Sequence, residues 1–153
     1  MEIGTGLALA RRPENPGSLS IMSNRFTVLL VEDDDPLRRC LRDLLAAEGW
    51  SVHATAFGLE AVELARTHPV DFSLVDFHLP GMSGLEVLRT ITDELRPLPS
   101  IMMSGEATNE EARMALAQHG VFRFLRKPLD LQHLRGSMSS LIQHHFGPQP
   151  PGA

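Results

Sequence analysis

The chain has 153 residues, of which 42% are hydrophobic, and its 14 Lys and Arg against 19 Asp and Glu give a formal net charge of −5 at pH 7. This length is typical of one domain, and the apolar content allows a core without disulfides or structural metals. No stretch gathers enough basic residues to follow nucleic-acid phosphates, and no segment approaches the roughly 18 apolar residues of a membrane span. We therefore expect a soluble, cytoplasmic protein that binds neither nucleic acid nor membrane directly.

The two ends of the sequence show no apolar periodicity. Residues 1–24 mix Gly, Pro, Ser and Asn, and residues 147–153 consist mostly of Pro and Gly. Segments of this kind bury too little apolar surface to offset the entropy of ordering. We therefore predict a flexible leader and a flexible tail around one domain at residues 25–146. Met22 stands just before the first apolar run and is a second candidate for the translation start, which would leave residues 1–21 untranslated.

Between these ends, short apolar runs alternate five times with amphipathic stretches. In chain order, the predicted strands cover Phe26–Glu32, Trp50–Thr55, Val70–Asp76, Ser100–Ser104 and Val121–Arg126. The predicted helices cover Asp35–Glu48, Gly58–Thr67, Ser83–Leu95, Asn109–His119 and Asp130–His145. Several strands are nearly continuous apolar runs, which is typical of strands covered on both faces. Strands that alternate with helices favour an α/β fold with an open parallel sheet and right-handed crossovers.

The first predicted helix carries two features that we interpret as structural. Asp35 precedes Pro36, an arrangement favoured where a helix begins, so Asp34 and Asp35 are expected to cap the helix and not to bind metal. Cys40 is the single cysteine, and its spacing from three leucines predicts a buried position on the apolar face. One cysteine cannot build a disulfide framework, which fits a reducing compartment.

Polar residues stand at the carboxyl ends of the predicted strands. They are Glu32, Asp33 and Asp34 after the first, Asp76 after the third, Ser104 after the fourth and Lys127 after the fifth. Each residue alone has a common structural explanation as a helix cap or turn residue. Ligands of open α/β sheets bind at the carboxyl ends of the strands, so the set should converge. Carboxylates bind Mg²⁺, and a lysine with a hydroxyl binds phosphate oxygens, so the set predicts a metal and phosphate site.

The segments VLLVEDDDPLRR, DFSLVDFHLPGMSGLEVL, IMMSGEAT and FRFLRKPLD carry this set. In this order and spacing they resemble the receiver domains of bacterial two-component response regulators, from Phe26 to about His145. The resemblance implies a flavodoxin-like (βα)5 fold, a doubly wound five-stranded parallel sheet with strand order 2-1-3-4-5. One helix and a short tail follow Lys127, so the chain is similar to stand-alone, single-domain members of that family.

The resemblance implies a role for each acid near the predicted metal site. Asp76 would accept a phosphoryl group beside Mg²⁺, or Mn²⁺ in its place. The metal would be bound by Asp33, Asp76 and the backbone carbonyl of His78, with Glu32 acting through water. His78 and Glu106 lie two residues beyond the acceptor and the hydroxyl, where side chains tune dephosphorylation. The lifetime of the phosphorylated state therefore stays open.

The resemblance also implies how phosphorylation is sensed. Ser104 and Lys127 would bind the phosphoryl oxygens, and Pro128 would follow a cis peptide bond that turns Lys127 into the site. Phe124 holds the position of an aromatic residue that moves inward with the hydroxyl and remodels the face made by the last strand and the last two helices. Many members carry tyrosine there, so a phenylalanine predicts a biased or weaker switch.

The implied activity is that of a signalling switch and not of an enzyme. The phosphodonor would be a sensor histidine kinase or a histidine phosphotransfer protein. The output would pass through an unknown downstream protein, because no output domain follows the last predicted helix. A homodimer that forms on phosphorylation is a further possible partner.

Two other functions remain as alternatives. A phosphate-independent receiver-like interaction module would keep the fold but would usually lack Asp76 or Lys127, and both are present. A phosphatase similar to the haloacid-dehalogenase superfamily would use Asp33, Asp34 and Asp35 as its Asp-x-Asp pattern. That superfamily needs a further acidic pair after the lysine, where this sequence predicts one amphipathic helix.

Overall fold

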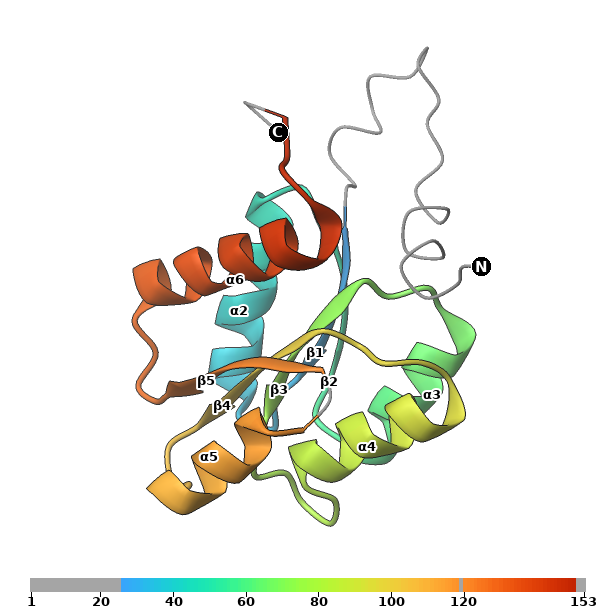
Figure 1. Cartoon of the computed structure of the whole chain (residues 1–153), viewed down its shortest axis with the longest axis vertical. Coiled ribbons are helices and arrows are strands. Elements are labelled where there is room, and N and C mark those ends of the chain that lie inside the picture. The colour runs from blue at the N-terminus through green and yellow to red at the C-terminus, as the bar shows by residue number, and fades with distance from the viewer. Residues whose placement is uncertain (1–25, 119, 151–153) are drawn as a thin grey trace.

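Five strands alternate with five helices along the described part of the chain, residues 26–118 and 120–150 of this computed structural model (Figure 1). In chain order they are β1 (Thr27–Val31), α2 (Asp35–Ala47), β2 (Ser51–Thr55), α3 (Gly58–Thr67), β3 (Phe72–Asp76), α4 (Gly84–Glu94), β4 (Ser100–Ser104), α5 (Asn109–Leu116), β5 (Val121–Arg126) and α6 (Leu131–Phe146). The strands form one parallel sheet in the order β2-β1-β3-β4-β5. The predicted α/β fold and the implied strand order are confirmed.

Helices cover both faces of the sheet (Figure 1). On one face, α2 and α6 bury their leucines against strand residues such as Leu30 and Leu74. On the other face, α3, α4 and α5 pack against residues such as Leu29 and Val75. Successive strand residues point to opposite faces, so the nearly continuous apolar runs of the inner strands supply both cores.

The pairing of β1 with β3 positions the residues that follow them. Val31 lies opposite Val75 in this parallel register. The next residues, Glu32 and Asp76, therefore lie at the carboxyl ends of neighbouring strands, at the same edge of the sheet. Both acids are buried, with 0% and 4% of their surfaces exposed.

Most element boundaries agree with the predicted ones to within two residues. The helix predicted to reach His119 ends earlier, at Leu116, because the N–H of Ala117 turns back to bond the carbonyl of Met114. His119 itself lies outside the described residues. Ser83 begins α4 and Thr108 begins α5 with reciprocal side-chain and backbone hydrogen bonds of the capping-box type.

The first helix confirms one structural interpretation and corrects another. The side chain of Asp34 accepts a hydrogen bond from the N–H of Leu37 at 2.9 Å, so it caps α2 as predicted, and Asp35 is the first helical residue. The prediction that Cys40 is buried is wrong, because this residue is exposed. The buried stripe of α2 consists of Leu41, Leu44 and Leu45, and the 100° turn per residue carries position 40 out of it.

The ends of the chain are described only in part. The predicted leader, residues 1–24, lies outside the described residues, and the predicted tail is described only for residues 147–150. At Gly147, a φ of 82° ends α6 in a conformation that glycine adopts readily. Among the described residues, none of the helices is both long enough and apolar enough to cross a membrane.

Candidate functional site

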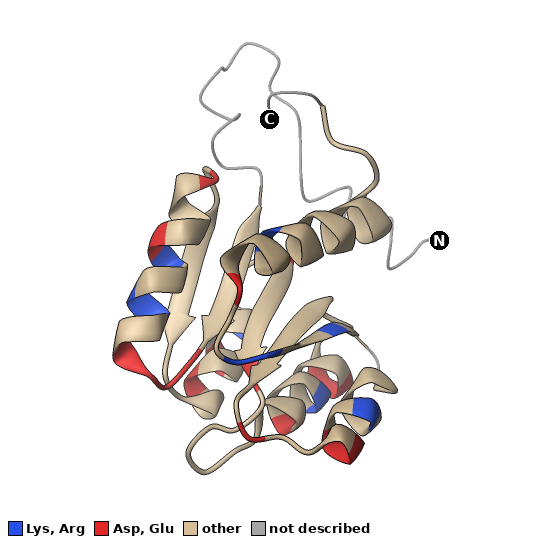
Figure 2. Cartoon of the chain, turned by 90° about the vertical axis from the view of Figure 1, so that its left-hand side faces the viewer, with Lys and Arg blue, Asp and Glu red and all other residues tan. Residues whose placement is uncertain are grey.

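The predicted polar residues meet at the carboxyl edge of the sheet. Glu32 and Asp33 follow β1, Asp76 ends β3, Ser104 ends β4 and Lys127 follows β5. Figure 2 shows acidic residues after β1 and basic residues at the end of β5 at this edge of the sheet. Four strands that lie side by side thus present these residues together, although the sequence separates them by up to 95 positions (127 minus 32).

Lys127 connects the two buried acids. Its Nζ lies 2.7 Å from Oδ2 of Asp76 and 2.9 Å from Oε1 of Glu32. The peptide bond between Lys127 and Pro128 is cis, the geometry that the resemblance implied. Burial alone would lower the pKa of Lys127, but the contacts with Asp76 and Glu32 outweigh burial and raise it. Lys127 is therefore a cation fixed beside Asp76 at neutral pH.

Glu32 is held in an environment that disfavours its charge. Its pKa is raised from an ordinary 4.5 to about 7, chiefly because burial removes water from the carboxylate. Lys127 and the N–H of Asp34 oppose this rise, whereas the nearby charge of Asp76 adds to it. The ion pair with Lys127 reaches Oε1, but this buried oxygen receives no well-directed hydrogen bond from the described residues. Its unused capacity suits a bound water or cation.

Three carboxylates form an acidic cluster that fits a divalent cation. Glu32, Asp33 and Asp76 each offer an oxygen, and these oxygens lie within 4.8 Å of one another. Glu32 and Asp76 are buried and Asp33 is exposed, so the cluster opens to solvent on one side. Mg²⁺ prefers oxygen ligands and keeps several of its waters, and this half-open set of oxygens meets both requirements.

The turn after β3 holds Asp76 in place. The N–H of His78 donates to Oδ1 of Asp76 at 3.0 Å, which leaves Oδ2 to Lys127. Gly84 begins α4 so close to this turn that an added Cβ would lie 2.1 Å from the carbonyl oxygen of Asp76. Only a glycine allows the helix to start there, and the predictions from sequence did not single it out.

Ser104 is buried at the end of β4 and is bound to the loop that follows it. Its Oγ accepts hydrogen bonds from the N–H groups of Glu106 and Ala107 at 3.1 and 3.0 Å. The same oxygen lies 3.1 Å from Nδ1 of His78. The side-chain contact between His78 and Ser104 could not be read from the sequence, because 26 positions separate the two residues.

Phe124 lies on β5 and is partly buried against the face covered by α3, α4 and α5. Its ring centroid is 5.9 Å from that of Phe77, and the guanidinium of Arg126 lies 5.5 Å from the Phe124 ring. Phe124 therefore packs against the turn that follows Asp76. Glu106, the other predicted tuning residue, is exposed on the loop after β4.

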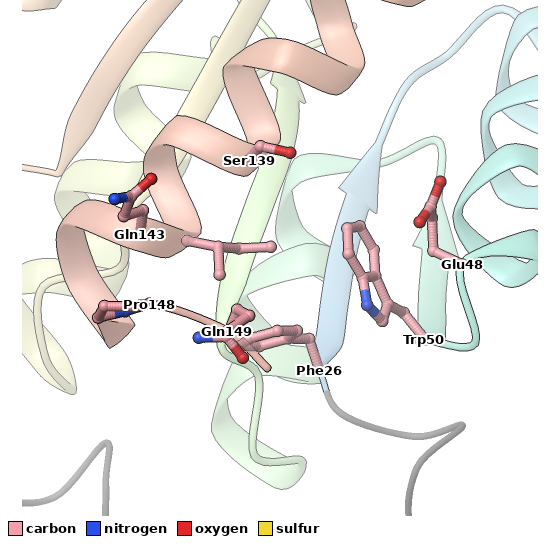
Figure 3. A pocket seen from close by; sticks show the side chains of 8 residues that line it. Phe26, Glu48, Trp50, Ser139, Gln143, Pro148 and Gln149 are labelled. Carbon is pink, nitrogen blue, oxygen red and sulfur yellow. The ribbon is translucent and has the colours of Figure 1, made fainter. Parts of the chain in front are cut away.

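A pocket of about 370 Å³ lies at the opposite, amino edge of the sheet (Figure 3). Figure 3 shows the rings of Phe26 and Trp50 facing α6 and the segment after it. The lining residues are Phe26, Glu48, Trp50, Ser139, Ile142, Gln143, Pro148 and Gln149. This pocket is separate from the acidic cluster, which marks the carboxyl edge.

A five-stranded parallel sheet with an acidic cluster and a partly buried lysine at its carboxyl edge is typical of α/β domains that bind a metal and a phosphoryl group. A family model described as the response regulator receiver domain matches residues 28–139. The chain therefore belongs to the response regulator receiver-domain family of two-component systems. The predicted resemblance is confirmed. Receiver domains bind Mg²⁺ at an acidic pocket, and the cluster of three carboxylates lies where that pocket is expected.

Several known proteins are similar to this chain. The polar-differentiation response regulator DivK of Brucella ovis is 34% identical over 118 residues, which are 76% of this chain and 95% of the relative. The signal receiver domain of an HD domain-containing protein from Pseudomonas fluorescens Pf-5 has a TM-score of 0.74 at 24% identity, covering 82% of this chain and 100% of that chain. The receiver domain of the Francisella response regulator 1452 has a TM-score of 0.71 at 22% identity, covering 78% of this chain and 98% of that chain. The two solved structures support the fold.

Proposed function

We propose that this chain is a phosphoacceptor response regulator in which Asp76 takes a phosphoryl group from a phosphohistidine of a sensor kinase or a histidine phosphotransfer protein. The observation that carries the proposal is the position of the Asp76 carboxylate. It is buried at the end of β3, 2.7 Å from Nζ of Lys127 and inside the acidic cluster. No structural need explains two buried acids beside a partly buried lysine at one sheet edge, because such groups are costly to bury.

In the proposed reaction, a carboxylate oxygen of Asp76 attacks the phosphorus atom and the bond from phosphorus to the donor imidazole breaks. Asp33, Asp76 and the backbone carbonyl of His78 would hold Mg²⁺, with Glu32 acting through water. The metal would supply positive charge for the transferring oxygens. Lys127 supplies a second positive charge, and its contacts with two carboxylates keep it protonated and in place.

The new phosphoryl group would change the contacts of Ser104 and then those of Phe124. Ser104 would donate a hydrogen bond from its hydroxyl to a phosphoryl oxygen, and this bond would draw the loop after β4 toward Asp76. Phe124 would follow, because it packs against Phe77 on the acceptor turn. Movement of Phe124 would alter the surface formed by α5, β5 and α6.

That surface is suited to a protein partner. Met114 and Leu116 on α5 and Leu131 at the start of α6 are among the exposed large hydrophobic residues, with 55%, 47% and 41% of their surfaces accessible. Exposed apolar side chains on these two helices are available to a protein partner. We therefore assign the output to a downstream protein or to a second copy of the chain, and we place the chain in the cytoplasm with its donor. On this proposal the chain is a switch whose only chemistry is its own phosphorylation and dephosphorylation.

Membership of the receiver family leaves the phosphatase alternative without support. The phosphate-independent module is separated from the proposal by one experiment. Wild type, Asp76→Ala and the control Asp93→Asn, an exposed acid on α4, are incubated with acetyl phosphate with and without Mg²⁺. Intact-mass analysis should show one added phosphoryl group on wild type and control, only with Mg²⁺, and none on Asp76→Ala. An unmodified wild type would instead identify a phosphate-independent module.

A further inference from the structure

Ser104 has one hydroxyl proton, and its surroundings determine which group receives it. Its Oγ accepts the N–H groups of Glu106 and Ala107 at 3.1 and 3.0 Å, and these two bonds use both lone pairs of the oxygen. The third contact of the same oxygen is Nδ1 of His78 at 3.1 Å. The hydroxyl therefore donates a hydrogen bond to Nδ1. This direction of the bond requires the His78 tautomer in which Nδ1 is the acceptor and Nε2 carries the ring proton.

The imidazole of His78 is held in this position from two sides. Its backbone N–H is bonded to Oδ1 of Asp76 at 3.0 Å. Its ring packs edge-on against Phe77 with centroids 4.9 Å apart, and Phe77 in turn packs against Phe124 at 5.9 Å. One side chain thus connects the acceptor turn, the buried hydroxyl and the aromatic residue of β5.

We propose that the side chain of His78 is a positioning residue that competes with the phosphoryl group for the hydroxyl proton of Ser104 and holds the unphosphorylated state. The inference rests on the proposed function of Asp76. Ser104 is fully buried, with 0% of its surface exposed. Bulk water therefore cannot accept the hydrogen bond of its hydroxyl when the bond to Nδ1 is broken. Ser104 must exchange one acceptor for the other. The affinity of the site for a phosphoryl group is therefore lowered by the strength of the bond to His78.

Two substitutions separate this hydrogen bond from the packing of the ring. His78→Phe keeps an aromatic ring against Phe77 and keeps the backbone N–H and carbonyl, but removes the acceptor Nδ1. His78→Asn loses the ring but keeps an acceptor oxygen close to the place of Nδ1. His78 is exposed, so both variants are expected to fold, and thermal melts monitored by circular dichroism check this.

The test is the affinity for beryllofluoride in the presence of Mg²⁺, measured by titration calorimetry. Beryllofluoride imitates an aspartyl phosphate without a covalent bond, so the result does not depend on dephosphorylation. His78→Phe should bind about fivefold more tightly than wild type, the size of one ordinary net hydrogen bond. His78→Asn should stay within about twofold of wild type. In a Ser104→Ala background, the Phe substitution should change nothing, because the competing proton is absent.

Three results would overturn the proposal. Equal affinity of wild type and His78→Phe would show that the contact does not compete. The same gain in the Ser104→Ala background would show that His78 acts by another route. Absence of binding to every variant, together with an unphosphorylated wild type, would remove the proposed function and this inference with it, whereas Mg²⁺-dependent phosphorylation of Asp76 with no gain in His78→Phe removes this inference alone.

Discussion

The two edges of the sheet are built from opposite kinds of residue. At the amino edge, an aromatic cluster of Phe26, Trp50, Phe72 and Phe146 packs with ring centroids 5.3–6.1 Å apart. At the carboxyl edge, Nζ of Lys127 lies 2.9 and 2.7 Å from the carboxylate oxygens of two buried acids. Aromatic burial stabilises a fold, whereas buried charges oppose it. The comparison indicates that the amino edge stabilises the fold, whereas the carboxyl edge holds charged groups at a cost in stability.

The largest expected effect is at the amino edge. Phe72→Ala removes a fully buried ring from the aromatic cluster and should lower the free energy of unfolding by about 3–5 kcal/mol. Urea titration measures this. The folded fraction should still accept phosphate from acetyl phosphate, because the substitution lies at the far end of β3. The matched control Phe57→Ala truncates a ring that is 60% exposed and should cost less than about 0.5 kcal/mol. Equal losses in both variants would show that the cluster has no special role.

The next effect concerns the close approach of α4 to β3 at the carboxyl edge. Gly84→Ala forces a Cβ against the carbonyl oxygen of Asp76 and should cost about 2–3 kcal/mol. It should also slow phosphorylation, because the acceptor turn must shift. Gly136→Ala on α6 meets no atom within 4 Å and should stabilise the protein by about 0.5–1 kcal/mol, as alanine does in a helix interior. The two substitutions should therefore change the free energy of unfolding in opposite directions, as measured by a thermal or urea melt.

The pKa of Glu32 predicts that stability without metal depends on pH. This pKa is about 7 in the fold against an ordinary 4.5, so between these values the folded protein holds a proton that the unfolded chain releases. Folding is therefore relatively favoured as the pH falls from 8 to 5. In EDTA, the free energy of unfolding of wild type should rise over this interval by roughly 2 kcal/mol more than that of Glu32→Gln. Parallel pH profiles of the two proteins would contradict a raised pKa of Glu32 in the folded state.

The smallest expected effect on stability comes from metal binding at the carboxyl edge. Mg²⁺ at ten times its Kd should raise the free energy of unfolding of wild type by about 1.4 kcal/mol. It does so by relieving repulsion within the acidic cluster. Asp33→Asn removes an exposed member of that cluster and should lose most of this gain while folding normally. Stabilisation of equal size in both proteins would assign the metal to another place.

Much of the fold followed from local patterns. Short apolar runs predicted the strands, and caps such as Asp34 marked where helices begin. The order of the strands did not follow from these patterns, because five similar βα units can be arranged in several ways; it came from the resemblance to receiver domains. The prediction for Cys40 was wrong because the buried stripe of α2 runs through Leu41, Leu44 and Leu45, and the 100° turn per residue carries position 40 out of it.

The candidate site could also be predicted only in part from the sequence. The polar residues at strand ends could be predicted, because a parallel sheet brings all its carboxyl ends together. Which of them touch could not, since the contacts of Lys127 with Glu32 and of His78 with Ser104 depend on how distant segments pack. The need for Gly84 likewise arises from the closeness of α4 and β3.

The central claim is that the buried carboxylate of Asp76 receives the phosphoryl group. The most direct measurement locates the modification: wild type is treated with acetyl phosphate and Mg²⁺, reduced with borohydride, which converts an aspartyl phosphate to homoserine, and sequenced by tandem mass spectrometry. The account predicts homoserine at position 76 and intact aspartate at Asp33 and Asp34. Homoserine at either of those positions, or an unmodified chain, would contradict it.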